Sequence, residues 1–345
     1  MTGRRIDIIC NDGSPLEVSE KTIRGDDGRM GVGGAELALL TMCRAWEFYG
    51  NKVRLYNNPK ERGASSFEQC DLSEFNPNEE RDILIVFRSP NQRIRDAKGK
   101  KYWWSCDSYT VDDFRAFRSQ VDKVICISKF HAKYFKDMYG IQDGIAIDLP
   151  VRTWEYDKHA PKIPKRCIFT SIPDRGVVEL LPAWQRIVKE VPDASLVITS
   201  DWRLWASWCT EEQIRTYKLA YANIPNVIYR GAVKRSELIQ IQQEADVHLY
   251  PSIFQEQFCI SVAESQVAGV YPITSDIGAL PTTNMGLVLH GNAQDSDWQN
   301  LFVEKAIETL NDPKLTQKQE WLREVARKRF SIENILRQWE DLVFS

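Results

Sequence analysis

The sequence contains no paired cysteine motif and no large excess of charge of either sign. Its eight cysteines stand singly, with no CxxC pair, at positions 10, 43, 70, 106, 126, 167, 209 and 259. Most lie in apolar runs such as RIDIIC and KVICIS, so we expect reduced core residues of a cytoplasmic protein and not a disulfide or zinc framework. The formal charge of -3 and the pI near 6.0 leave no global basic field, so nucleic acid is not an expected partner.

A long apolar run is also missing. No stretch of about 18 apolar residues occurs, which excludes a membrane span, and any membrane contact is expected to be peripheral. The first residues, MTGRRIDIIC, pass directly into a strand pattern without the apolar core of a signal peptide. We therefore expect neither a transmembrane protein nor export by that route.

Histidine is scarce and isolated. The four histidines, at 131, 159, 248 and 290, show no HxxxH spacing. The lone Asp-x-Asp, Asp295 to Asp297, lies in a polar loop before a helical pattern and is interpreted as a helix-capping segment. We accordingly expect no metal site and no cofactor.

Short β-rich runs recur at intervals too long for hairpins. In the first half they cover residues 5–10, 52–57, 82–87, 101–106, 123–128 and 144–149. Helical patterns such as AELALLTMCRAWEFYG lie between several of them. Near-continuous apolar strands that alternate with helices indicate a parallel sheet covered on both faces.

Residues 149–166 interrupt this rhythm with prolines and charges and are typical of an inter-domain linker. The rhythm then restarts, with runs at 166–171, 195–200, 226–231, 246–252, 270–275 and 286–291. The fold class predicted is α/β, with two doubly wound Rossmann-like domains facing across a cleft, divided at 155/156. Ligands of such sheets bind at the carboxyl ends of the strands.

The stretch EQFCISVAE places Glu256 and Glu264 eight positions apart, on either side of a helix start. Unpaired amides at that start attract a phosphate or diphosphate, and ionised carboxylates accept hydrogen bonds from sugar or ribose hydroxyls. A nucleotide sugar has this layout, with one hydroxyl-rich ring on each side of a diphosphate. The alternative is that Glu256 is a loop charge favoured by the helix dipole and that Glu264 pairs with a surface Lys or Arg.

The run from 249 to 283, which contains this stretch, resembles the donor-site signature of retaining glycosyltransferases of the GT-B architecture, the glycosyl transferases group 1 or family 4-like enzymes. Their signature has two glutamates separated by seven residues. The resemblance implies that Glu256 contacts the transferred sugar, that Glu264 contacts the nucleotide ribose, and that the amides of Cys259, Ile260 and Ser261 hold the diphosphate.

Two further segments carry the resemblance. GVGGAELALL is similar to the family's N-terminal glycine loop, in which Gly33 and Gly34 would let the backbone approach the donor phosphates or the acceptor. This run lies some twenty residues after the first strand, which argues against a dinucleotide fingerprint. NVIYRGAVKRSEL resembles the loop that receives the nucleotide base, with Gly231 to Lys234 nearest to it.

The chain departs from the family at two positions. In FTSIPDRG the family's phosphate-neutralising pair of cations becomes Thr170 and Arg175, so only the second cation is kept. In KYWWSCDSYT, Cys106 replaces a family histidine, while the adjacent Asp107 is kept. Arg175 as a solvated loop charge, and Asp107 as a helix N-cap or turn carboxylate, are the alternatives.

The resemblance implies a metal-independent, retaining hexosyltransferase-type enzyme. Residues 1–155 would form the acceptor domain, 156–328 the donor domain, and 329–345 a helix that crosses back to the first domain. Glu256, Arg175 and Asp107 are the predicted catalytic residues, and Cys106 and Asp107 the acceptor-side candidates. The partners expected are a nucleotide-sugar donor and a glycan or other hydroxyl acceptor.

Two other function classes stay open beside this one, and the role of one tryptophan stripe is also open. Thr170 and Cys106 are compatible with a non-catalytic protein that binds a sugar nucleotide or glycan. A nicotinamide-dependent oxidoreductase is disfavoured by the position of the glycine run. Trp202, Trp205 and Trp208 recur at every third residue and indicate a packed helical face, or else a stacking platform for a sugar acceptor.

Overall fold

The computed structural model describes residues 3–10, 17–158, 160–201 and 210–345. The chain forms two compact units: unit 1 is Met1–Gly28, Gly34–Pro150 and Ile332–Ser345, and unit 2 is Arg29–Gly33 and Val151–Ser331. The chain passes from unit 1 to unit 2 at 150/151, where the sequence analysis expects a boundary at 155/156. It returns to unit 1 at 331/332, where the expected boundary is 328/329. No helix in the described ranges is long and apolar enough to cross a membrane.

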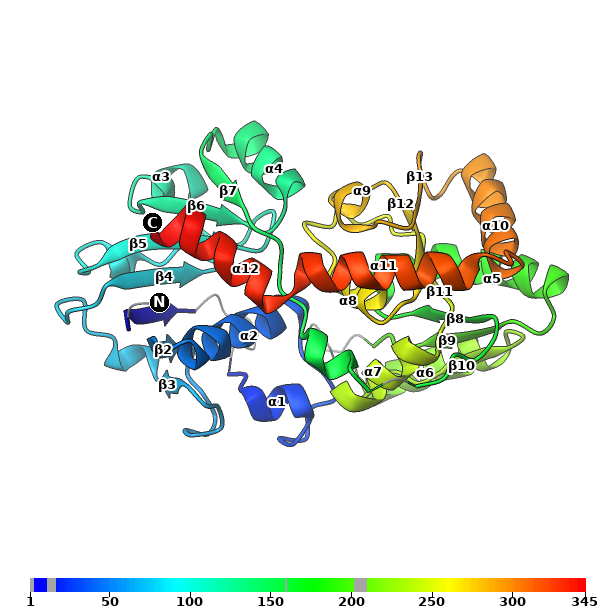
Figure 1. The fold of residues 1–345 in the computed structure, drawn as a ribbon, viewed down its shortest axis with the longest axis horizontal. Coiled ribbons are helices and arrows are strands. Elements are labelled where there is room, and N and C mark those ends of the chain that lie inside the picture. The colour runs from blue at the N-terminus through cyan, green and yellow to red at the C-terminus, as the bar shows by residue number, and fades with distance from the viewer. Residues whose placement is uncertain (1–2, 11–16, 159, 202–209) are drawn as a thin grey trace. The chain divides into compact units, whose positions relative to one another are not determined.

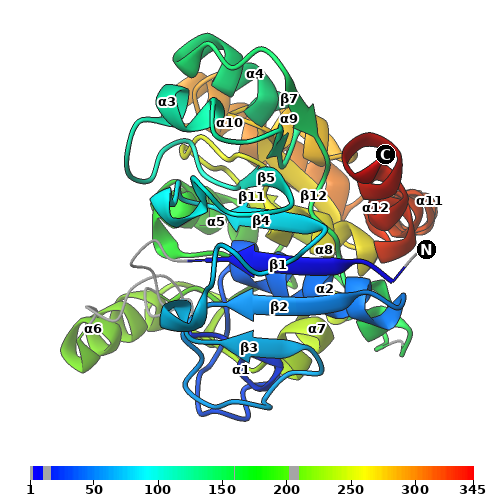
Figure 2. The same cartoon turned by 90° about the vertical axis from the view of Figure 1, so that its left-hand side faces the viewer.

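Unit 1 contains a seven-stranded sheet in the order β3-β2-β1-β4-β5-β6-β7, with every pairing parallel. Figure 2 shows its β5, β4, β1, β2 and β3 side by side. The strands are β1 (Arg5–Ile9), β2 (Lys52–Tyr56), β3 (Glu68–Cys70), β4 (Ile83–Phe87), β5 (Lys100–Ser105), β6 (Lys123–Cys126) and β7 (Gly144–Ala146). The sequence patterns predict all of these except β3, whose three residues, EQC, form no apolar run.

The helices of unit 1 are α1 (Glu20–Arg24), α2 (Gly34–Phe48), η1 (Leu72–Glu74), η2 (Gln92–Ile94), α3 (Phe114–Arg118), α4 (Lys129–Tyr139), α12 (Ile332–Trp339) and the terminal η6 (Glu340–Phe344). Among them, α2 and α4 pack on this sheet, and Figure 1 labels both beside α1, α3 and α12. The elements α12 and η6 belong to unit 1 although they follow unit 2 in the chain. Trp339 of α12 contacts Trp46 and Trp104 edge-on, with ring centroids 5.2 and 5.3 Å apart. This aromatic packing is why the final helix joins the first sheet.

Unit 2 repeats the plan with a six-stranded parallel sheet in the order β10-β9-β8-β11-β12-β13. Its strands are β8 (Arg166–Phe169), β9 (Ser195–Ile198), β10 (Val227–Tyr229), β11 (Val247–Tyr250), β12 (Tyr271–Ser275) and β13 (Leu287–Leu289). Every residue of β11 is buried, as expected for a central strand covered on both faces.

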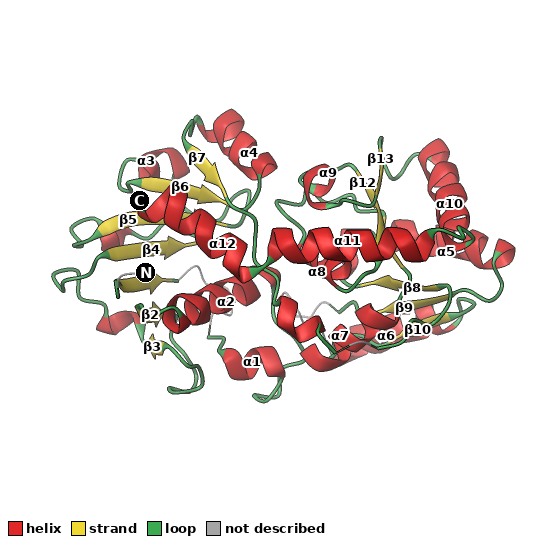
Figure 3. Cartoon of the chain, in the orientation of Figure 1, coloured by secondary structure: helices red, strands yellow, loops and turns green. Residues whose placement is uncertain are grey.

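The helices of unit 2 are shown in Figure 3. They are η3 (Thr153–Tyr156), η4 (Pro173–Arg175), α5 (Val177–Glu190), α6 (Glu211–Ala222), α7 (Arg235–Glu244), α8 (Ile260–Val267), α9 (Leu280–Thr283), α10 (Ser296–Leu310) and α11 (Leu315–Phe330). One core cluster joins the sheet to α5 and α10, through residues such as Trp184 and Phe302. The α/β class with two doubly wound sheets is thereby confirmed.

The described residues of the linker segment, 149–158 and 160–166, make specific contacts with unit 2 despite their irregular sequence. Tyr156 is buried, and its hydroxyl donates to Oε1 of Gln242 at 2.7 Å. The Nζ atom of Lys162 donates to the carbonyls of Ala245 and Gly269 at 2.5 and 2.9 Å. Burial lowers the pKa of Lys162 to about 8. From Val151 onwards the segment is therefore part of unit 2. This is why the boundary falls at 150/151, before the expected 155/156.

Candidate active site

The loop between β11 and α8 carries the donor-motif glutamates. Cys259, the residue before α8, has a left-handed φ of 75°, which is uncommon for a residue other than glycine. Ile260 and Ser261 open the helix and are only half-buried. The amides of a first helical turn have no intrahelical partner, so this start is suited to an anion.

The backbone of Glu256 is fixed by the loop that follows β12. The amide of Ala279 donates to the Glu256 carbonyl at 2.7 Å. Gly278 has a φ of +63°, and a Cβ there would lie 2.3 Å from the Glu256 carbonyl oxygen and 2.6 Å from its nitrogen. The glycine therefore allows the loop after β12 to lie directly against Glu256. A motif confined to residues 256–264 does not reveal this contact.

The carboxylate of Glu256 faces two side chains from other parts of unit 2. Its Oε1 accepts a hydrogen bond from the Tyr250 hydroxyl at 2.6 Å and lies 3.6 Å from Nε of Arg175. Burial raises the pKa of Glu256, while Arg175 and the Tyr250 hydrogen bond oppose that rise. A buried carboxylate beside a cation and a hydroxyl is typical of a ligand-binding site.

Arg175 ends η4, at the carboxyl end of β8. The next residue, Gly176, has a φ of +116°, and a Cβ there would lie 2.4 Å from the Pro251 carbonyl oxygen, so η4 packs directly on the donor-motif loop. The Arg175 guanidinium stacks over Phe254, 3.3 Å from the ring centroid, and pairs with Asp174 at 2.6 Å. Its side chain is only 12% exposed, so the alternative of a solvated loop charge is wrong.

Glu264 is buried on α8 and pairs with Arg235, the first residue of α7, at 2.7 Å. The alternative from the sequence pairs Glu264 with a surface Lys or Arg. The structure shows an arginine partner, but that arginine is buried. Arg235 in turn contacts Glu155 of η3 at 2.8 Å. The sequence patterns single out neither Arg235 nor Glu155, because positions 155, 235 and 264 share no local motif.

The remaining donor-side residues have different environments. Thr170 follows β8 and is buried, and its hydroxyl has no hydrogen-bond partner among the described residues. Gly231 has a left-handed φ of 67°, and the next amide, of Ala232, donates to Oδ2 of Asp201 at 3.4 Å. Lys234 is exposed and precedes the first turn of α7.

The acceptor-side candidates lie in unit 1, after β5. Asp107 pairs with Arg88, with Nε and Oδ2 2.5 Å apart, and Arg88 also pairs with Glu36 of α2 at 2.8 Å. Asp107 precedes no helix, so the N-cap alternative is wrong. Cys106 beside it is buried, and burial raises the pKa of its thiol well above the ordinary range.

The glycine loop is divided between the two units. Gly33 belongs to the short segment Arg29–Gly33, which clusters with unit 2, while Gly34 begins α2 in unit 1.

Arg88 has a left-handed φ of 70°, and its carbonyl accepts a hydrogen bond from Nε1 of Trp103 at 2.9 Å. A charged cluster at the carboxyl end of β4 and β5 thus adjoins the α2 start.

The described residues contain no group of three or more His, Cys, Asp or Glu side chains arranged to hold a metal ion. His131 and His248 are fully buried, and burial lowers the pKa of each to about 3. Asp295 occupies the N-cap position of α10, as interpreted from the sequence, without a capping hydrogen bond from its side chain. Trp202, Trp205 and Trp208 lie outside the described residues.

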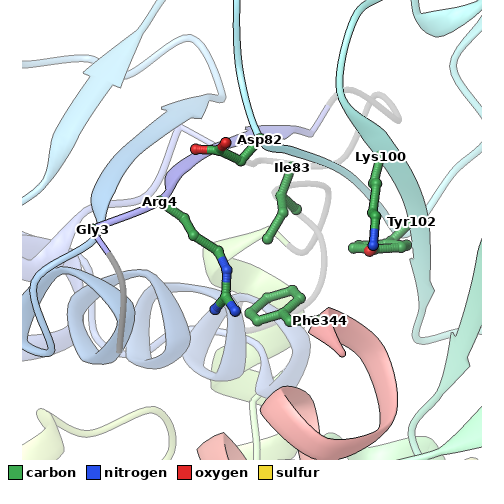
Figure 4. A pocket seen from close by; sticks show the side chains of 7 residues that line it. All are labelled: Gly3, Arg4, Asp82, Ile83, Lys100, Tyr102 and Phe344. Carbon is green, nitrogen blue, oxygen red and sulfur yellow. The ribbon is translucent and has the colours of Figure 1, made fainter.

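A separate pocket of about 350 Å³ lies in unit 1 (Figure 4). It is lined by Gly3, Arg4, Asp82, Ile83, Lys100, Tyr102 and Phe344. Apart from Phe344 of η6, these residues lie at or near the amino-terminal ends of β1, β4 and β5, whereas Cys106 and Asp107 follow the carboxyl end of β5. No predicted site residue lines this pocket.

Comparison with known families decides how the donor-motif geometry is interpreted. Residues 170–329 match the family model described as "Glycosyl transferases group 1". The match covers most of unit 2 and just under half of the chain. The matched span contains Thr170, Arg175, Arg235 and both motif glutamates, as well as the start of α8. A search of curated proteins gives no match for the chain.

Solved structures show that the whole chain has the GT-B fold. Sucrose-phosphate synthase from Thermosynechococcus elongatus is similar with a TM-score of 0.72 at 16% identity, covering 98% of this chain and 98% of the other. Anabaena HepE, solved with UDP and glucose, is similar with a TM-score of 0.68 at 13% identity, covering 99% of both chains. A glycosyltransferase from Rickettsia africae has a TM-score of 0.69 at 13% identity, covering 99% of this chain and 98% of that one.

Proposed function

We propose that this glycosyltransferase transfers a hexosyl group from a nucleotide-diphosphate sugar to a hydroxyl of a glycan, with retention of anomeric configuration and without a metal ion. The observation that carries the proposal is the convergence of Glu256 and Arg175 beside the open start of α8. These three features provide an acceptor of hydroxyl hydrogen bonds, a cation and free amides, which together match a sugar diphosphate.

In this proposal the diphosphate lies at the first turn of α8. The amides of Cys259, Ile260 and Ser261 and the guanidinium of Arg175 bind its oxygens, and Glu256 accepts hydrogen bonds from the sugar. Glu264 binds the ribose, and the loop from Gly231 to Lys234 lies nearest the base. The complex of Anabaena HepE with UDP and glucose, on the same fold, supports this class of donor.

Charge on the leaving diphosphate grows as the sugar–oxygen bond breaks. Arg175 and the α8 amides stabilise that charge, which is the dominant electrostatic contribution expected in such a site. Thr170 adds only a neutral hydroxyl where the family has a cation, so Arg175 carries the positive charge of the clamp. The acceptor hydroxyl attacks on the face that the leaving group departs from, and a diphosphate oxygen receives its proton.

The acceptor is assigned to unit 1. Asp107 and Glu36 are two carboxylates that share the guanidinium of Arg88. Carboxylate oxygens of this kind accept hydrogen bonds from the hydroxyls of a glycan. The Asp107 side chain is 31% exposed, which leaves it accessible to such a ligand.

A non-catalytic protein that binds sugar nucleotides is the second candidate. The neutral, buried Thr170 favours it, because the clamp then has one cation fewer than the family pattern. A thermal-shift screen with UDP-, GDP- and ADP-sugars identifies the donor for either candidate. Transfer and donor hydrolysis, followed with the same donors, then separate them: a binder shows a raised Tm without turnover.

Glu256→Gln tests the assignment directly. We expect kcat to fall on the order of 100-fold, because the amide replaces the acceptor-only carboxylate at the sugar, while nucleoside diphosphate binding is retained. Glu308→Gln, an exposed carboxylate on α10, is the control and should transfer at the wild-type rate. Transfer should persist in excess EDTA, and NMR should show the donor's anomeric configuration in the product. A Glu256→Gln enzyme with unchanged kcat contradicts the role proposed for Glu256.

A further inference from the structure

Three charged side chains from separate parts of unit 2 form one buried chain of contacts. Glu155 lies in η3, Arg235 begins α7, and Glu264 lies in α8. Nε and Nη2 of Arg235 both lie 2.8 Å from Oε2 of Glu155, and the same Nη2 lies 2.7 Å from Oε1 of Glu264. The guanidinium therefore bridges the two carboxylates.

The guanidinium of Arg235 is held on more than one side. Its CZ atom lies 5.9 Å from the centre of the Tyr156 ring, and Nη2 lies 3.5 Å from the Tyr156 hydroxyl. The Tyr156 hydroxyl is itself fixed by Gln242. A planar guanidinium with this set of partners has one orientation, whereas a lysine ammonium could not reproduce the bridge.

Because both side chains are buried, the position of the Glu264 carboxylate depends on this bridge. The Glu264 side chain is 4% exposed and that of Arg235 is 8% exposed. Leaving a carboxylate without a partner at such a depth is strongly destabilising, so the geometry of Glu264 depends on its contact with Arg235. Among the described residues, Arg235 is the one cation within ion-pair distance of Glu264, and the distance of 2.7 Å joins its Nη2 to Oε1.

We propose that Arg235, anchored by Glu155, is the positioning residue that holds the Glu264 carboxylate in place and directs it to the ribose hydroxyls of the donor. The inference rests on the proposed function, since it assumes a nucleotide donor. It assigns ribose recognition to the three contacting residues Glu155, Arg235 and Glu264. Only Glu264 belongs to the two-glutamate motif. Glu155 comes from the segment that connects the two units, outside the span matched by the family model.

The test compares ribonucleotides with their deoxy forms. Calorimetry measures the Kd of UDP, GDP and ADP, and of the 2′-deoxy and 3′-deoxy forms of whichever binds. Wild type should bind the ribonucleotide at least about 10-fold more tightly than one of the deoxy forms, as a hydrogen bond to a charged group requires. In Glu155→Gln that ratio should fall to about 3-fold or less, with the Kd of the deoxy form unchanged.

Glu244→Gln is the matched control. Glu244 ends α7 and pairs with Arg166 at 2.6 Å, so its loss removes a half-buried ion pair from the same helix that carries Arg235. It should keep the wild-type ratio. Arg235→Lys provides a second variant and should also lower the ratio, while Glu264→Gln should abolish it.

The outcomes separate the inference from the function on which it rests. A Glu155→Gln protein that keeps the wild-type ratio, or that weakens ribo and deoxy forms equally, overturns the positioning role and leaves the proposed function intact. Wild type that binds none of the three diphosphates overturns the proposed function itself. A reduced ratio in Glu155→Gln and Arg235→Lys, with Glu244→Gln unchanged, supports the inference.

Discussion

At the residue scale, the phosphate clamp contains one cation where the related pattern has two. Arg175 is held between the Phe254 ring and the carboxylates of Asp174 and Glu256. Stacking on an aromatic face fixes the plane of a guanidinium without neutralising it. In a site whose other clamp position is Thr170, this stacking fixes the orientation of the remaining positive charge.

Phe254→Leu removes that aromatic surface. We expect kcat for sugar transfer to fall about 5- to 30-fold, because the loss of a partly desolvated cation–π contact of about 1–2 kcal/mol lets Arg175 leave its catalytic orientation. Phe254→Tyr keeps the ring and should retain most of the rate. Steady-state kinetics of both variants provides the measurement. Equal kcat values for the leucine and tyrosine enzymes would show that the ring does not position Arg175.

The motif residues could be predicted from the sequence, but their partners could not. Glu256, Arg175 and Glu264 belong to short local patterns, so their place at strand ends and helix starts follows from chain order. Arg235 and Arg88 could not be found in this way, because each pairs with carboxylates on two other elements. Such contacts depend on how the elements pack, which hydrophobic periodicity does not specify.

At the element scale, strands were the most predictable feature. Buried parallel strands are continuous apolar runs, and this pattern identifies β4 and β11 from sequence alone. β3 is too short to show the pattern, and its pairing with β2 comes from the tertiary fold. The close packing of loops at the site also escapes sequence analysis, since Gly278 and Gly176 resemble ordinary turn residues.

Gly278→Ala tests the loop packing against Glu256. A methyl group would lie 2.3 Å from the Glu256 carbonyl oxygen, so the loop must move, at a cost of about 2–4 kcal/mol for strain and left-handed φ together. Gly269→Ala is the control: its φ of +75° is similar, but the nearest atom to the new Cβ is 3.5 Å away. Thermal unfolding should show a larger loss of Tm for Gly278→Ala. An equal loss in both variants would mean that the contact with Glu256 is not restrictive.

At the scale of the whole molecule, two histidines among the described residues are fully buried, His131 in unit 1 and His248 in unit 2. Burial lowers the pKa of each to about 3, below the unfolded value near 6.5. The unfolded chain therefore binds more protons between these pH values, so stability is present above pH 6.5 and is lost as the pH falls towards 3.

Each histidine should lower the free energy of unfolding of its unit by up to about 1.4 kcal/mol per pH unit below pH 6.5. Urea titrations at pH 7.5 and 5.5 provide the measurement. Wild type should unfold at a lower urea concentration at pH 5.5. His248→Gln should be less stable at pH 7.5 but should show a smaller change between the two pH values. An unchanged pH dependence in that variant contradicts the assignment to His248.

The position of α12 affects how the protein is made. Unit 1 is built from Met1–Gly28, Gly34–Pro150 and the segment after Ser331, and Trp339 completes the aromatic cluster around Trp46 and Trp104. On the ribosome, all of unit 2 emerges before that tryptophan does. Unit 2 therefore has all of its residues before unit 1 does. Until Trp339 is synthesised, the faces of Trp46 and Trp104 that it covers in the folded protein have no packing partner there.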